Sequence, residues 1–99
     1  MKSSLFFRVY DVLESNDDCV NKVLKIRDIF DKEKWDRFEV ESTRADCGNW
    51  LYEIRINYLY HAGCGDTEEE AFFEAMMELI LKITREAFNS YKRGSDEIE

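Results

Sequence analysis

The segment from Asp66 onward constrains the fold most, because it contains both a helix start and a long helical pattern. Thr67 is followed three residues later by Glu70, which is the pattern of a capping box at the first turn of a helix. Apolar residues then recur at helical spacing and predict the longest helix of the chain: Ala71, Phe72, Met76, Leu79, Ile80, Ile83 and Ala87. We expect this helix to end near Gly94, which assigns residues 1–94 to a single domain and residues 95–99 to a polar tail.

The middle of the chain has the two-residue period of half-buried strands. Phe38, Val40 and Ser42 alternate with polar neighbours, and a turn is predicted over residues 46–49. The alternation resumes at Trp50 and continues to His61, which is long for one strand. A tight turn near Asn57 would divide this run into two strands and invert which side chains are buried in the second one. Residues 62–65 are expected to form a flexible loop, in which glycine supplies positive φ.

The first third of the chain predicts two helices. Residues 4–14 fit a helix capped by Ser4, with a strand as the alternative. After a polar break at residues 15–18, a second helix is expected, with an apolar face that comprises Val20, Val23, Leu24 and Phe30. The whole pattern predicts an α+β domain. An antiparallel sheet of two or three strands would pack against two or three helices, in the order α-α-β-β-(β)-α.

The charge is unevenly distributed along the chain. The 99 residues include 14 Lys and Arg against 22 Asp and Glu, for a net charge of −8. Almost all of the excess lies after residue 45, and much of it gathers at the predicted start of the long helix: Asp66, Glu68, Glu69, Glu70, Glu74 and Glu78. These six residues are the predicted partner-binding site. Their sign disfavours direct contact with nucleic acid or an anionic membrane and favours a basic protein surface.

Three cysteines and one histidine are the remaining candidates for chemistry. Cys47, His61 and Cys64 are possible metal ligands, but zinc needs about four ligands and no Cys-x-x-Cys pair is present. A Cys–His nucleophile would need a positive environment, which this acidic half does not provide. We therefore expect no catalytic residue, no metal, no cofactor and no enzymatic activity. No leader or membrane-length apolar run is visible, so free thiols including Cys19 indicate the cytoplasm.

Residues 50–83 resemble the small phage proteins called ABA-sandwich domains. The resemblance rests on a strand that begins at Trp50, the run Gly63-Cys64-Gly65-Asp66-Thr67, and an acid-rich helix that contains Ala71 and Ala75. This chain departs from the family pattern at Cys64, between the two glycines, and lacks the proline that is common after the threonine. The resemblance implies a phage or prophage origin and α+β layering, and it carries no activity.

The functional prediction is a non-enzymatic protein of phage type that binds a basic surface of a host protein in the host cytoplasm. Such a protein could inhibit a nucleic-acid-binding defence complex, in the manner of anti-CRISPR or DNA-mimic proteins. One alternative is a structural or housekeeping domain that self-associates as a homodimer through apolar surface of the sheet or the last helix. Another is a double-stranded-RNA-binding-like domain of helix, three strands and helix, which would require a basic helix start.

Overall fold

The computed structural model describes residues 5–98 of the chain, and side chains within residues 5–87. The elements follow in the order α1 (Leu5–Leu13), α2 (Cys19–Lys32), β1 (Phe38–Arg44), β2 (Trp50–Ile56), β3 (Leu59–Gly65) and α3 (Glu68–Ile98). The predicted α+β fold is therefore confirmed, in its version with three strands. The first segment is a helix, as predicted, and not the alternative strand. Its predicted cap, Ser4, lies outside the described residues.

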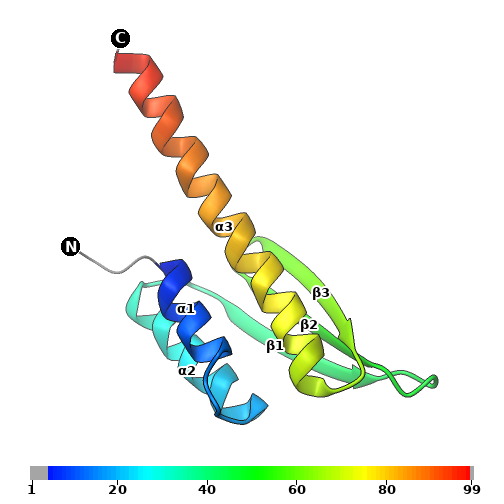
Figure 1. Cartoon of the computed structure of the whole chain (residues 1–99). Coiled ribbons are helices and arrows are strands. Elements are labelled where there is room, and N and C mark those ends of the chain that lie inside the picture. The colour runs from blue at the N-terminus through cyan, green and yellow to red at the C-terminus, as the bar shows by residue number, and fades with distance from the viewer. Residues whose placement is uncertain (1–4, 99) are drawn as a thin grey trace.

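The sheet is antiparallel with the strands in sequence order, and the helices lie against one face of it (Figure 1). α3 packs along β2 and β3, and the α1–α2 hairpin packs beside α3. On β2 the side chains of Tyr52, Ile54 and Ile56 are buried on the helix side. The opposite face carries exposed side chains from all three strands, including Glu41, Arg55 and Tyr60. The alternation of apolar and polar residues in the sequence therefore corresponds to the buried and exposed faces of the sheet.

A two-residue turn divides the long alternating run, as predicted. Ile56 pairs with Leu59 across the turn formed by Asn57 and Tyr58. Leu59 is buried and Tyr60 is exposed, so the buried parity inverts after the turn. Asn57 has a φ of 53°, a conformation that asparagine tolerates better than most residues. Its side chain also holds the start of β1, because its Oδ1 accepts hydrogen bonds from the backbone N–H groups of Asp36 and Arg37, each at 3.0 Å.

Replacing Asn57 with Gly is expected to destabilise the domain by about 1–2 kcal/mol, since two backbone donors lose their acceptor while the positive φ remains allowed. Asn57→Asp retains the acceptor oxygen and is the matched control, so it should lose much less. Urea unfolding of the three proteins measures the difference. Equal stability of the wild type and Asn57→Gly would show that these hydrogen bonds contribute nothing to the fold.

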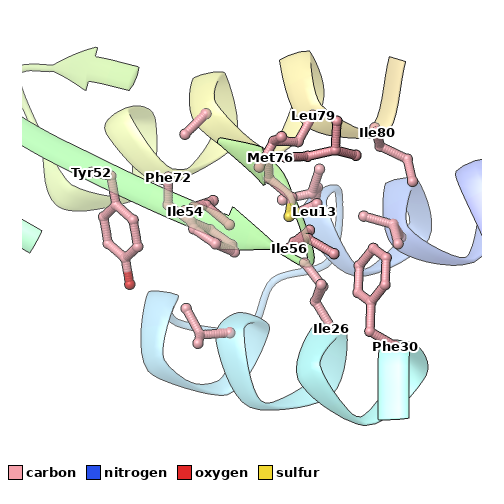
Figure 2. Close-up of a cluster of buried hydrophobic side chains, with 14 of the residues drawn as sticks. Leu13, Ile26, Phe30, Tyr52, Ile54, Ile56, Phe72, Met76, Leu79 and Ile80 are labelled. Atoms are coloured by element: carbon pink, nitrogen blue, oxygen red, sulfur yellow. The ribbon is translucent and has the colours of Figure 1, made fainter. Parts of the chain in front are cut away.

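The core lies between the sheet and the helices (Figure 2). It is formed by large side chains from both layers: Leu13, Ile26, Phe30, Tyr52, Ile54, Ile56, Phe72, Met76, Leu79 and Ile80. The buried face of α2 differs from the predicted one. Cys19, Val23, Ile26 and Phe30 are buried, whereas the prediction of Val20 and Leu24 on this face is wrong.

Val20 is 66% exposed and Leu24 is 52% exposed. Val20 and Leu24 widen the apolar surface of α2 beside the buried stripe, but their line continues through the charged residues Arg27 and Asp31. The buried stripe is the one that stays apolar along the whole helix, through Ile26 and Phe30.

The segment predicted as a glycine loop is the second half of β3. Neither Gly63 nor Gly65 has a positive φ, so the predicted role of these glycines is wrong. A Cβ atom at Gly63 would lie 2.5 Å from the backbone oxygen of Ala71 and 2.5 Å from the backbone nitrogen of Ala75. The glycine is needed because α3 packs directly on the backbone of β3.

α3 also continues through Gly94 to Ile98, where the sequence predicted a polar tail. A single glycine costs a helix only about 1 kcal/mol, and the surrounding residues include good helix formers such as Lys92, Arg93 and Glu97. Gly94 alone is therefore a weak signal for the end of a helix.

Candidate functional site

The start of α3 is fixed by Thr67 and Glu70, the two residues of the predicted capping box, with the return hydrogen bond shifted to the residue before the cap. The backbone N–H of Glu70 donates to Oγ1 of Thr67 at 3.1 Å, and the backbone N–H of Asp66 donates to Oε2 of Glu70 at 3.1 Å. Both bonds satisfy amides that have no partner within the helix. Glu70 therefore has a structural role in addition to its negative charge.

The six predicted carboxylates, which we call the acidic surface, do not share one environment. Asp66, Glu69, Glu70, Glu74 and Glu78 are exposed, whereas Glu68 is half-buried. Glu68 lies near the first turn of α2. Burial raises the pKa of the Cys19 thiol, and the negative charge of Glu68 adds to that shift. The part of the acidic surface available to a partner is thus formed mainly by Glu69, Glu74 and Glu78, together with Asp66 and the outer part of Glu70.

Within residues 5–87 no residue of the acidic surface takes part in an ion pair. The ion pairs of this part of the chain join other residues: Arg8–Glu33, Lys25–Asp17, Lys32–Asp28 and Arg37–Glu39. Lys22 lines a shallow hollow together with Glu69, Glu70 and Phe73. Its ammonium donates to the backbone oxygen of Leu13 at 2.9 Å, which ties it to the end of α1. Within residues 5–87 the five exposed carboxylates therefore form no ion pair, although Lys22 lies beside Glu69 and Glu70 in the hollow.

An apolar row runs beside the acidic residues on the outer side of α3. Glu70, Glu74 and Glu78 are spaced by four, and so are Phe73, Met77 and Leu81, which we call the apolar row. Residues four apart lie above one another on a helix, so both sets form stripes along α3. Phe73 is 37% exposed and Leu81 is 39% exposed, while Met77 is half-buried.

This apolar row was not predicted from the sequence. The four-residue spacing of the apolar row in the sequence was enough to indicate it. A stripe that begins three residues after Glu70 and repeats every four residues lies beside the acidic residues, away from the centre of the buried face. The acidic surface is therefore bordered by exposed apolar side chains.

The candidate metal ligands are not brought together. His61 and Cys64 are three apart in β3, and an odd separation in a strand places side chains on opposite faces. Cys47 lies in the turn between β1 and β2, and Cys19 is buried in α2. In the described part of the chain, no group of three His, Cys, Asp or Glu residues has the geometry to hold a metal ion.

The fold and this surface define a small α+β domain whose longest helix carries an acidic stretch that forms no ion pair within residues 5–87. The chain has no significant match among protein-family models, curated proteins or solved structures. None of the described helices combines the length and the apolar character that crossing a bilayer requires.

Proposed function

We propose that this protein is a non-enzymatic binding protein whose acidic surface docks onto a basic surface of another protein. The observation that carries the proposal is that these carboxylates are solvent-facing and unpaired within residues 5–87. A cluster of unneutralised charge steers association toward the opposite sign and adds specificity. The neighbouring apolar row would supply the buried contact area that charge alone does not provide.

The partner in this proposal is a host protein that uses the same basic surface to hold nucleic acid, and the protein acts in the host cytoplasm. A row of carboxylates along a helix can occupy a cationic groove that otherwise binds phosphates, because both ligands are polyanions. Inhibition of a nucleic-acid-binding defence complex by a phage-type protein follows from this competition. The support for this part is the charge distribution and the ABA-sandwich resemblance of residues 50–83.

The test is capture of host proteins on the immobilised chain. Glu69, Glu74 and Glu78 are changed together to Lys, which reverses the exposed charges and leaves the capping box intact. The expected result is loss of the proteins that the wild type retains at about 0.15 M salt, and their elution from the wild type at higher ionic strength. The captured protein should also lose its nucleic acid when free wild-type chain is added.

The matched control carries the same change in net charge elsewhere: Asp11→Lys, Glu41→Lys and Asp46→Lys. These three acids are exposed and lie outside the acidic surface. The control variant should retain the same proteins as the wild type. Capture of those proteins by the triple variant of the acidic surface would refute the proposal, and equal loss with both variants would reduce it to an effect of net charge.

The double-stranded-RNA-binding alternative agrees with one observation, because the elements from α2 to α3 follow the order helix, three strands, helix. Binding to an RNA duplex depends on contacts to phosphates, and the helix start that would approach them carries Glu68, Glu69 and Glu70. A mobility-shift titration with a duplex of about 20 base pairs separates the two proposals. Tight, salt-sensitive binding of the duplex would overturn the protein-binding proposal.

A further inference from the structure

β1 forms one edge of the sheet, so half of its backbone hydrogen-bonding groups face no neighbouring strand (Figure 1). The backbone N–H of Asn57 donates to the oxygen of Arg37 at 3.0 Å, and that of Ala45 donates to the oxygen of Asn49 at 2.8 Å. These two bonds set the phase of the ladder, because hydrogen-bonded positions alternate along an antiparallel pair. The odd-numbered residues of β1 bond to β2, and the N–H and C=O groups of the even-numbered residues point away from the sheet. In the described part of the chain, no turn or loop bonds to these outward groups.

This edge lacks the structural devices that commonly stop a strand from pairing further. β1 spans seven residues, Phe38–Arg44, in continuous register with β2, so no bulge interrupts it. The strand contains no proline and no lysine. α2 packs on one end of β1, where the rings of Phe30 and Phe38 stack with their centroids 5.5 Å apart. The side chains of residues 41–44 are exposed, so the rest of the edge is open to another strand.

Charge indicates which kind of strand fits this edge. On the open face of the sheet Glu41 lies directly opposite Glu53 of β2, and like charges in this position destabilise a sheet. Neither carboxylate takes part in an ion pair within residues 5–87. Both line a shallow hollow that also contains Glu39 and Arg55. Carboxylates outnumber cations there even when Arg37, the ion-pair partner of Glu39, is included. A basic side chain beside Glu41 would therefore be stabilised.

A second copy of this chain fits the same edge poorly. Two β1 strands that pair antiparallel over their whole length place Glu41 opposite Glu41 of the partner subunit. Glu53 of each copy would lie next to its own Glu41, so four carboxylates would form a row across four strands. The acidic side chains of β1 thus disfavour pairing with a like strand and favour a basic one.

We propose that the free edge of β1 binds an extended segment of a partner protein in which basic and apolar side chains alternate. The segment adds antiparallel to β1 as a fourth strand, and its backbone bonds to residues 40, 42 and 44. The residue opposite Glu41 occupies a non-hydrogen-bonded pair, in which cross-strand side chains are closest, so Lys or Arg at that position pairs with Glu41. The alternate apolar side chains lie on the helix side of the sheet, beside Val40.

This contact is separate from the acidic surface of α3 and does not rest on the host partner proposed above. A single added strand buries less area than a standard protein–protein interface, so the binding is weak and rapidly reversible. Such binding does not survive the washing of an immobilised chain. Capture of host proteins, including its control with Glu41→Lys, therefore reports on the acidic surface alone, and either proposal can fail without the other.

Amide hydrogen exchange measured by NMR, with and without a probe peptide, tests the added strand. The probe is a blocked peptide of the same length as β1 in which lysine alternates with valine. It should slow the exchange of the amides of residues 40, 42 and 44, whereas those of residues 39, 41 and 43 are already bonded to β2 and should change little. A peptide with glutamate in place of lysine should bind about tenfold more weakly or worse, and so should a peptide of the probe's composition with its lysines consecutive.

Two substitutions in β1 separate the backbone contribution from the charge. Ser42→Pro removes one outward N–H and places its ring against the added strand, while residues 41 and 43 keep their bonds to β2. It should weaken binding of the probe about tenfold or more, whereas the matched control Ser42→Ala should bind like the wild type. Retained protection of the amides of residues 41 and 43 confirms that the proline variant is folded. Glu41→Lys should remove most of the preference for the lysine probe over the glutamate peptide.

Equal binding of the lysine and glutamate peptides by the wild type would overturn the proposal. So would binding of the probe that leaves the amides of residues 40, 42 and 44 unprotected, because the peptide would then lie elsewhere. Protection of the same three amides on raising the concentration of the wild type alone would also overturn it, since the occupant would then be a second copy.

Discussion

Gly63→Ala is expected to destabilise the domain by about 3 kcal/mol. The new Cβ would lie 2.5 Å from the backbone oxygen of Ala71, and both backbones would have to separate to relieve the overlap. Moving α3 away from β3 also loosens the buried contacts around Ala75. Because small domains are only marginally stable, this loss removes a large part of the free energy of unfolding.

Urea unfolding of Gly63→Ala and of the adjacent variant Cys64→Ala measures this effect. Cys64 is exposed on the other face of β3, so its replacement should change stability by no more than about 0.5 kcal/mol. The same two variants also test the assignment of residues 62–65 to a strand. A Gly63→Ala protein as stable as the wild type would show that β3 and α3 are not in close backbone contact.

Phe72→Ala should have an effect of similar size, about 3–5 kcal/mol, through the loss of a buried ring and the cavity left behind. Phe72 is 1% exposed, and its ring centroid lies 5.0 Å from that of Tyr52. This contact joins α3 to β2 (Figure 2). Loss of the ring removes packing from both layers at once.

Phe73→Ala is the matched control, since the same side chain is removed one residue further along the same helix. Phe73 is 37% exposed, so the loss of stability should be much smaller. Thermal unfolding followed by circular dichroism compares the two variants. Similar melting temperatures for the two variants would contradict the orientation of α3 on the sheet.

Local patterns predicted much of this fold. Residues 38–60 alternate between apolar and polar side chains, and a run longer than a typical strand indicated two strands joined near Asn57. Thr67 and Glu70 located the start of α3. These features could be read from the sequence because their physical causes lie within a few residues. A pleated strand, a tight turn and a helix cap each depend on neighbours in the chain.

Features that depend on distant residues were not predicted. Gly63 has the appearance of a loop glycine, and only the approach of Ala71 and Ala75 explains it. Val20 and Leu24 are exposed because α2 packs on the core through Cys19, Val23, Ile26 and Phe30. α3 continues past Gly94, because the helix formers around a single glycine outweigh its cost.

The candidate site also combines features that local sequence predicts with features that depend on distant residues. The four-residue spacing of Glu70, Glu74 and Glu78 was enough to place them together on one side of a helix. The half-buried position of Glu68 is set by the first turn of α2, which no local pattern reveals. The absence of ion pairs on the acidic surface within residues 5–87 depends on where the cations of the first half fold, such as Lys22.

The length of α3 also determines how the particle behaves in solution. The molecule measures 55 × 25 × 22 Å with a radius of gyration of 15.0 Å, whereas a compact chain of this size has a radius of gyration of about 13 Å. An elongated particle experiences extra friction, so it elutes early from a gel-filtration column and imitates a heavier globule. Its mass therefore has to be determined by light scattering or sedimentation equilibrium, which do not depend on shape.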